Sequence, residues 1–351
     1  MDLNDYQHFS LIDQADMLGH IDGLPDQLQE AWRLGSMLPL PQLAPVRNIV
    51  VAGMGGSAIG ADLLTSYLSD TLQVPFFVQR DYGLPAFAAG NETLLVASSH
   101  SGNTEEVLSA FEQGLKNGCQ LMAVCTGGKL EAKATEAGVP LWKFTHSGQP
   151  RTAVGFSFGL ILALLTRIGL VQDPHSELQD AVEVMKALQS NVGAAVPLLK
   201  NPAKRQAGQL FDRHVTFFAG GFMSPVARRW KTQFNEVAKT FTSFEPIPEA
   251  DHNTLAGIIN PVSNITREFS FFITASADNP RNQLRMEKTR AIMMLEGVGT
   301  DVFHAKGETR LAQMWSSILY GDYLAYYLAL AYDTDPTPIP PIAALKIEMT
   351  G

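Results

Sequence analysis

The strongest constraint on the fold is a strand–turn–helix pattern that occurs twice in each half of the chain. It spans residues 47–68 and 93–128 in the first half, and residues 214–234 and 268–305 in the second. Each copy begins with an apolar run, passes through a glycine-containing or polar turn, and continues with helical periodicity. Strands that alternate with helices favour parallel sheets with helices on both faces. The sequence therefore predicts a duplicated α/β unit.

The length and one break in the pattern predict where the two halves meet. At 351 residues the chain exceeds the size at which a single hydrophobic core usually stops growing. Asp173, Pro174 and His175 interrupt an apolar helix. We therefore predict an N-terminal domain over residues 1–172 and a C-terminal domain over residues 173–351. The second domain is expected to end in an extended proline arm, "DPTPIPP", and a short helix that carries Lys346.

The composition excludes several classes of function. The chain has 26 basic and 35 acidic residues and a net charge of −9, which argues against general binding to nucleic acid or to anionic membranes. Its two cysteines, Cys119 and Cys125, form no disulfide or metal motif, and the first residues do not resemble a secretory signal. We expect a cytoplasmic protein. Residues 154–171 are almost long enough to span a membrane, but Arg167 favours a buried helix.

Two of the turns predict an anion site. "GMGGSAIG" and "SSHSGNTEE" each lie between a strand and a helix, where unpaired backbone N–H groups and the helix dipole attract negative charge. Their hydroxyl groups can donate hydrogen bonds to phosphate oxygens. Helix capping is the better explanation of either turn alone, but two turns at neighbouring strand ends favour a ligand. A dinucleotide site is the alternative, because Gly53–Ala58 approximates its fingerprint and Asp81 lies about 20 residues further on.

Six motifs together resemble one enzyme family. In chain order they are "GMGGSAIGADL", "SSHSGNTEE", "QPRTAVG", "KTQFNEVAK", "DHNTLAG" and "DPTPIPPIAALK". They are similar to motifs of the bifunctional phosphoglucose/phosphomannose isomerases, which are built from two sugar isomerase (SIS) domains. The resemblance covers nearly the whole chain. It implies an α/β fold of two tandem SIS domains, each a parallel sheet between helix layers in a flavodoxin-like, three-layer arrangement.

The resemblance also implies an activity. Members of this family interconvert glucose 6-phosphate and mannose 6-phosphate with fructose 6-phosphate through a cis-enediol, with no metal and no other cofactor. One carboxylate that moves a proton between C1 and C2 serves both sugars, because they are epimers at C2. By the motifs, Glu236 corresponds to this base and His252 to the histidine that opens the sugar ring. Lys346 and Arg151 correspond to residues that support ring opening and the charge of the intermediate.

The phosphate-binding residues implied by the resemblance lie in the two turns. They are Gly55, Gly56, Ser57, Ser99, Ser101 and Thr104. The chain departs from the family pattern at His100, where many relatives carry tyrosine, and at Thr254, where an acid is common.

Each further site residue has a simpler alternative when the sequence is considered alone. Glu236 is also explained as an exposed helix carboxylate paired with Lys231 or Lys239. His252 is also explained as a loop histidine balanced by Asp251, and Lys346 as an exposed lysine of a final helix.

The resemblance further implies a homodimer in which His252 reaches the site of the neighbouring subunit. The apolar segments "GLILALL" and "YLAYYLALAY" also suggest an interface, since they exceed what one small core needs. Two other functions stay open, namely an isomerase for another phosphorylated aminosugar and a non-catalytic sugar-phosphate sensor.

Overall fold

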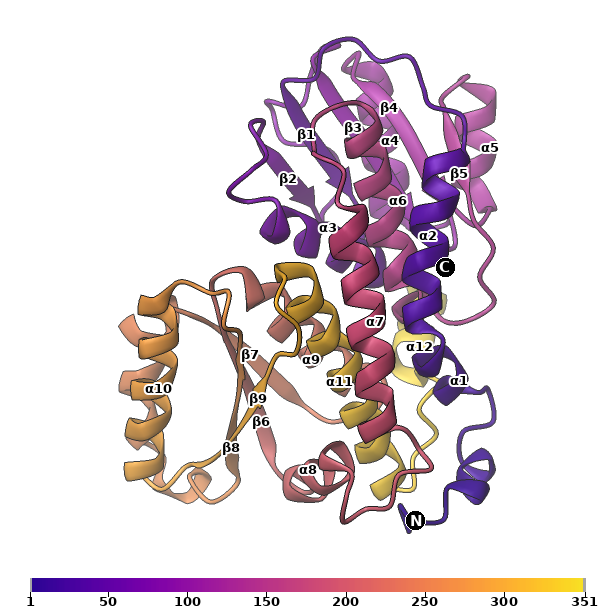
Figure 1. Ribbon diagram of the computed structural model, residues 1–351. Coiled ribbons are helices and arrows are strands. Elements are labelled where there is room, and N and C mark those ends of the chain that lie inside the picture. The colour runs from indigo at the N-terminus through magenta and orange to yellow at the C-terminus, as the bar shows by residue number, and fades with distance from the viewer. Residues whose placement is uncertain (1, 350–351) are drawn as a thin grey trace. The chain divides into compact units, whose positions relative to one another are not determined.

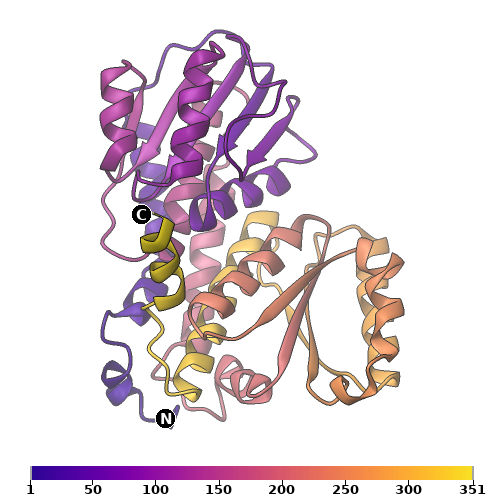
Figure 2. The same ribbon diagram turned by 180° about the vertical axis from the view of Figure 1, so that it is seen from behind.

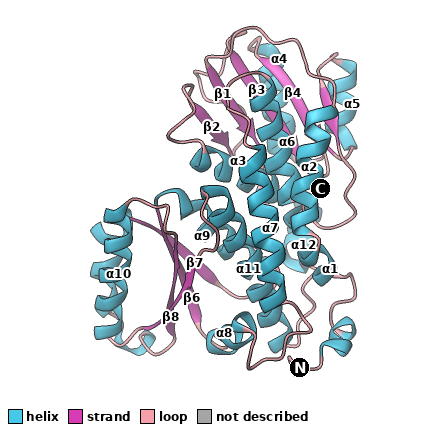
Figure 3. Ribbon diagram, in the orientation of Figure 1, coloured by secondary structure: helices cyan, strands magenta, loops and turns pink. Residues whose placement is uncertain are grey.

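The computed structural model describes residues 2–349, and these divide into two compact units. The first unit is Gly23–Val182, and the second combines residues 2–22 with residues 183–349. Each unit contains one parallel sheet with helices on both faces, as the strands and helices of Figure 3 show. This confirms the predicted α/β class and the duplication.

The sheet of the first unit has five parallel strands in the order β2-β1-β3-β4-β5. The strands are β1 Asn48–Ala52, β2 Phe76–Gln79, β3 Thr93–Ser99, β4 Gln120–Cys125 and β5 Leu141–Lys143. This is the flavodoxin-like order. Every residue of β3 is buried, which explains why the strand reads as a continuous run of apolar and small side chains.

The first unit contains six helices and one short 3₁₀ helix. They are α2 Leu24–Met37, α3 Gly55–Tyr67, α4 Glu105–Lys116, α5 Gly128–Glu136, η2 Pro150–Thr152, α6 Val154–Arg167 and the start of α7 His175–Val192. Helices α4 and α5 share a core with alternate side chains of β1, β3 and β4 and so cover one face of the sheet (Figure 2). Helix α3 packs on β1 and β2 and also on α6, which in turn packs on α2.

The second unit repeats the topology with four parallel strands in the order β7-β6-β8-β9. The strands are β6 His214–Gly220, β7 Thr242–Ile247, β8 Glu268–Thr274 and β9 Gly299–His304. Strand β6 corresponds to β1, and β7, β8 and β9 to β2, β3 and β4. Figure 1 shows helix α10 on one side of this sheet and helices α9 and α11 on the other.

The remaining helical elements belong to the second unit. They are η1 Tyr6–Leu11, α1 Met17–Asp22, α8 Pro202–Leu210, η3 Gly221–Met223, α9 Ser224–Glu236, η4 Glu249–His252, η5 Thr254–Ile259, η6 Val262–Asn264, α10 Pro280–Leu295, α11 Arg310–Ala331 and α12 Pro340–Met349. Helix α12 follows the proline arm, as the sequence predicted.

The compact units differ from the predicted domain bounds in two places. The division falls inside α7, ten residues beyond the predicted boundary at residue 172. The first 22 residues belong to the second unit, because Phe9 packs against the rings of Tyr326 and Tyr327 and the Tyr323 hydroxyl donates to the Asp22 carboxylate. The bounds of the two SIS domains remain a prediction.

The two apolar segments that suggested an interface are buried within the chain itself. "GLILALL" lies in α6, where every residue from Val154 to Leu165 is buried, and α6 packs on α2 and α3. "YLAYYLALAY" lies in α11, which packs on α8 and α9. This argument for a dimer was therefore wrong. Within residues 2–349, no helix combines the length and the apolar character that a membrane span requires.

Candidate functional site

The first turn joins β1 to α3 and presents a helix start that no side chain caps. Met54 is the N-cap residue of α3 and its side chain makes no capping hydrogen bond. Gly55 has a φ of +48°, and a Cβ added there would meet nothing within 4 Å, so the turn is open on this side. Free amides at the start of a 13-residue helix provide the positive end of the helix dipole.

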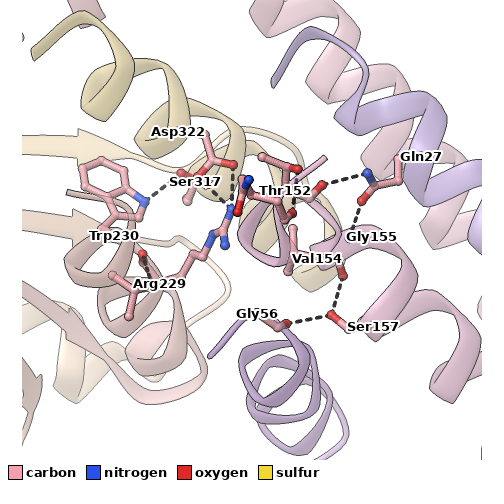
Figure 4. Close-up of polar contacts among 12 residues, drawn as sticks. Gln27, Gly56, Thr152, Val154, Gly155, Ser157, Arg229, Trp230, Ser317 and Asp322 are labelled. Atoms are coloured by element: carbon pink, nitrogen blue, oxygen red, sulfur yellow. Dashed lines mark hydrogen bonds and ion pairs between the residues drawn. The ribbon is translucent and has the colours of Figure 1, made fainter. Parts of the chain in front are cut away.

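Gly56 is needed for a different reason, which is a close approach of two chain segments. A Cβ at Gly56 would lie 2.3 Å from the carbonyl oxygen of Pro150 and 3.2 Å from the Cα of Arg151. The first turn of α3 therefore packs directly on the backbone of η2. Ser157 also joins α6 to this turn, because its hydroxyl donates to the Gly56 carbonyl at 2.9 Å (Figure 4).

The second turn joins β3 to α4 and is built by its own hydroxyl groups. Ser99 is 2% exposed, and its Oγ accepts from the Gly102 N–H at 3.1 Å and lies 2.8 Å from Thr104 Oγ1. Exposed Ser101 accepts from the Asn103 N–H at 3.2 Å, which leaves its hydroxyl proton available to a ligand. Thr104 is the N-cap residue of α4, but its side chain makes no capping bond. The hydroxyls therefore shape the turn rather than cap the helix.

A hydrogen bond joins the two turns. The backbone N–H of His100 donates to Ser57 Oγ at 3.2 Å. The strands that precede the turns, β1 and β3, are parallel neighbours in register, so both turns lie at the same edge of the sheet. The structure thus brings together Gly55, Gly56, Ser57 and the Ser99–Thr104 turn, as the sequence predicted.

Arg151 completes this group within the first unit. It lies in η2, against the first turn of α3, and is 2% exposed. The next residue, Thr152, is held by Gln27, whose Nε2 donates to the Thr152 carbonyl at 2.8 Å while its Oε1 accepts from the Gly155 N–H at 2.8 Å (Figure 4). A buried arginine in the segment that packs on the first turn suits a site for a phosphorylated ligand.

The sequence did not identify two side chains of this neighbourhood, His146 and Gln27. His146 Nδ1 lies 3.0 Å from His100 Nε2, and burial lowers the pKa of His100. His146 stands four residues before the "PRT" motif, and this proximity was the only available signal. Gln27 gave no signal, because it lies in α2, more than 120 residues from its partners.

Glu236, the predicted base, is the last residue of α9 in the second unit and is partly buried. Just beyond it, Lys239 adopts a left-handed backbone conformation with a φ of +58°. The Lys239 ammonium donates to the carbonyl oxygen of Glu236 and, at 3.1 Å, to that of Pro336. Lys239 therefore ties the end of the Glu236 helix to the proline arm that precedes Lys346.

His252 and Lys346 both lie on exposed segments of the second unit. His252 ends η4 and is exposed. The adjacent Asp251 carboxylate instead accepts from Arg285 Nη1 at 3.0 Å and from Thr289 Oγ1 at 2.7 Å, which fixes η4 to α10. Lys346 lies in α12, which has no buried residue. Three separate elements thus carry Glu236, His252 and Lys346.

The turns of the second unit that correspond to the phosphate turns have different chemistry. A Cβ on Gly221 would lie 2.1 Å from Asp278 Oδ1, and one on Gly220 would lie 2.6 Å from Asp278 Oδ2. The chain's own carboxylate therefore fills the space in front of the β6–α9 turn. A second negative group there would meet electrostatic repulsion. The β1–α3 turn of the first unit is therefore open to an anion, whereas the β6–α9 turn is not.

Helix α9 is anchored in the second unit by a buried ion pair. Arg229 Nη2 lies 2.9 Å and 3.2 Å from the two carboxylate oxygens of Asp322 in α11, and both side chains are almost fully buried (Figure 4). Burial raises the pKa of Asp322, and Arg229 opposes this shift. Next to this pair, Trp230 Nε1 donates to the Ser317 carbonyl at 2.8 Å. These contacts fix the helix that ends at Glu236.

Within residues 2–349, no three His, Cys, Asp or Glu side chains gather in a metal-binding arrangement. The expectation that the reaction needs no metal stays a prediction.

Comparisons with known proteins agree with the two-unit architecture. A family model described as the bacterial phospho-glucose isomerase C-terminal SIS domain matches residues 199–349. A bifunctional phosphoglucose/phosphomannose isomerase from Caldicellulosiruptor bescii is 34% identical over 332 residues, which are 94% of this chain and 98% of the relative. A D-glucosamine-6-phosphate 4-epimerase from Sulfolobus acidocaldarius is 31% identical over 219 residues, 62% of this chain and 65% of the relative.

Among solved structures, a hypothetical protein from Thermus thermophilus superimposes with a TM-score of 0.77 at 16% identity. The match covers 99% of this chain and 94% of that protein, so it supports the fold over both units.

Proposed function

Because this chain belongs to the bifunctional phosphoglucose/phosphomannose isomerase family, we propose that it interconverts glucose 6-phosphate and mannose 6-phosphate with fructose 6-phosphate. The observation that carries the proposal is the 34% identity to a relative of that name over 94% of this chain and 98% of the relative. The two glycine and hydroxyl turns support a phosphorylated substrate, because they combine free helix amides with neutral donors beside a buried arginine. In this proposal Gly55, Gly56, Ser57, Ser99, Ser101 and Thr104 hold the phosphate group.

The proposed chemistry moves only protons, at the ring oxygen and at C1, C2 and their oxygens, and leaves the atoms of the sugar unchanged in number. His252 would exchange a proton with the ring and hydroxyl oxygens so that the sugar opens to its aldehyde. Glu236 would then take the proton from C2 of the aldose while the aldehyde oxygen O1 gains a proton, forming a cis-enediol. Return of the proton to C1, with loss of the proton from the C2 hydroxyl, gives the ketose. Arg151 and Lys346 would stabilise the negative charge that develops on the enediol oxygens.

We also propose that the protein is a cytoplasmic homodimer whose His252 acts in the neighbouring subunit. His252 is exposed, while Asp251 beside it is held by Arg285 and Thr289. A side chain that projects from a fixed loop is suited to reach a site outside its own unit. Cys119 and Cys125 are free thiols, which agrees with a reducing compartment.

The test is turnover of glucose 6-phosphate and of mannose 6-phosphate to fructose 6-phosphate, measured with a chelator present. Loss of a general base lowers rates by about 10²- to 10⁴-fold, so Glu236→Gln is expected to lower kcat by that factor for both sugars. The control is Glu296→Gln, which removes an exposed carboxylate at the end of α10 in the same unit and should leave kcat unchanged. Wild-type protein that binds these sugars without turning them over would contradict the proposal and favour a sensor.

A second candidate function comes from the relative named D-glucosamine-6-phosphate 4-epimerase, which is 31% identical over 219 residues. A phosphorylated aminosugar would present the same phosphate group to the same turns. Glucosamine 6-phosphate should therefore be assayed in parallel, with detection of the C4 epimer. Turnover of this sugar in preference to the two hexose phosphates would replace the first candidate with the second.

A further inference from the structure

Two imidazoles that the proposed function does not use stand beside the phosphate turns. His100 directly follows β3 and His146 follows β5, both in the first unit. His100 Nε2 and His146 Nδ1 are 3.0 Å apart, and the two rings are nearly perpendicular, at 86°. One nitrogen of the pair must therefore donate and the other accept.

Two phenyl rings pack against the histidine pair. Phe144 and Phe156 stack with their centroids 4.7 Å apart, and His100 and His146 each meet one of them edge to face. Both imidazoles are partly buried, and burial lowers the pKa of His100, so its ring is neutral at pH 7.

The partners of Thr152 fix the direction of the hydrogen bonds. The Thr152 hydroxyl donates its only proton to the Gln149 carbonyl at 2.9 Å, so it accepts from His146 Nε2, which is 3.5 Å away. With the His146 ring neutral, its other nitrogen, Nδ1, then carries the lone pair. His146 Nδ1 consequently accepts from His100 Nε2–H.

These bonds form a chain that connects three segments of the phosphate site. At one end, the backbone N–H of His100 donates to Ser57 Oγ in the first turn. His100 itself belongs to the second turn. At the other end, Thr152 follows Arg151 in η2. This series of hydrogen bonds therefore connects the two hydroxyl-bearing turns with η2, the segment that carries Arg151.

We propose that His146, acting through His100, is a positioning residue that fixes the Ser99–Thr104 turn relative to Arg151. This inference rests on the proposed function, since it concerns how the same site holds the phosphate group. A ligand that is bound by donors from three segments is held tightly only if these segments already have the correct separation before it binds. Ordering the segments upon binding would lower the affinity. The His146 side chain accepts from the second turn and donates toward η2, so it presets that separation.

The test compares variants of the full-length protein that remove both hydrogen bonds of His146 or restore one of them. His146→Phe keeps an aromatic ring on Phe156 but has no polar atom. His146→Asn restores an acceptor near the position of Nδ1. The control is His175→Phe, which changes an exposed histidine of the same unit that accepts from Trp32. Each protein is titrated with inorganic phosphate and with glucose 6-phosphate by calorimetry, and kcat and KM are measured separately.

Loss of one hydrogen bond of ordinary length, at 3.0 Å, and of one long bond, at 3.5 Å, corresponds to about a tenfold change in affinity. His146→Phe is expected to raise the Kd for phosphate and the KM about tenfold, with kcat within about twofold of wild type. His146→Asn should recover most of the affinity, and His175→Phe should match wild type. Phosphate affinity of His146→Phe equal to wild type would overturn the inference, and so would His146→Asn binding as weakly as His146→Phe. Wild-type protein that binds phosphate but turns over neither hexose phosphate would reject the proposed function alone.

Discussion

Substitution of Gly56 by alanine tests the packing of α3 on η2, which brings Arg151 to the phosphate turns. The added Cβ would lie 2.3 Å from the Pro150 carbonyl oxygen, about 1 Å short of the 3.4 Å at which ordinary contacts begin. The obstacle is backbone, which cannot rotate away like the end of a side chain. Either α3 or η2 must therefore move by about 1 Å.

Two opposing terms set the effect of Gly56→Ala on stability. Overpacking costs about 1–3 kcal/mol, while alanine in place of glycine inside a helix returns about 0.5–1 kcal/mol. The net loss is about 0–2.5 kcal/mol, which lowers the melting temperature of a unit of this size by up to several degrees. The effect on activity should be larger, because a displacement of about 1 Å at a positioning contact reduces rates by about 10²-fold.

The assay is kcat/KM for glucose 6-phosphate together with thermal unfolding, with Gly208→Ala as the matched control. Gly208 also lies inside a helix, α8, but a Cβ added there would meet nothing within 4 Å. The control should therefore keep full activity and gain slightly in stability. Gly56→Ala protein with kcat/KM within about twofold of wild type would refute the reasoning, because it would mean that the contact between α3 and η2 does not set the site.

Two further predictions concern buried ionisable groups. Asp322→Ala leaves the Arg229 guanidinium buried without its carboxylate, so urea unfolding should show that the free energy of unfolding falls by about 3–5 kcal/mol. The added change Arg229→Met should recover most of this loss. A loss below about 1 kcal/mol in Asp322→Ala alone would contradict the prediction. Burial lowers the pKa of His100 from its usual 6.5, so the unfolded chain binds this proton more tightly than the folded chain. The stability due to neutral His100 is therefore complete above pH 6.5 and is lost as the pH falls towards the lowered value. His100→Asn should flatten the dependence of unfolding free energy on pH between 7 and 5, and an unchanged slope would disprove the assignment.

The fold was predictable from the sequence because its strongest signals are local. Buried parallel strands such as β3 are continuous apolar runs, and the turns that follow them contain glycine or hydroxyl residues. The convergence of Ser57 with the Ser99–Thr104 turn followed from strand order, since neighbouring parallel strands end at one edge. The same glycine pattern left a dinucleotide site open, and only a match over 94% of the chain decided for the isomerase family.

What the sequence could not predict depends on contacts between distant segments. The placement of residues 2–22 in the second unit rests on Phe9 and on Asp22, whose partners lie in α11, about 300 residues away. The burial of α6 and α11 within the chain likewise depends on which helices pack on them, and hydrophobicity alone does not distinguish an internal helix from an interface. His146 was missed because its partner His100 lies 46 residues earlier.

The duplicated unit also explains why equal topology does not give two equal sites. Strands β1 and β6 are each followed by a glycine turn with a positive φ, at Gly55 and Gly221. The space in front of Gly55 is open, whereas the Asp278 carboxylate stands against Gly221. Burial raises the pKa of Asp278. The β6–α9 turn is thus filled by one side chain of the β8–α10 turn, and the contributions proposed for the second unit come from α9, η4 and α12 instead.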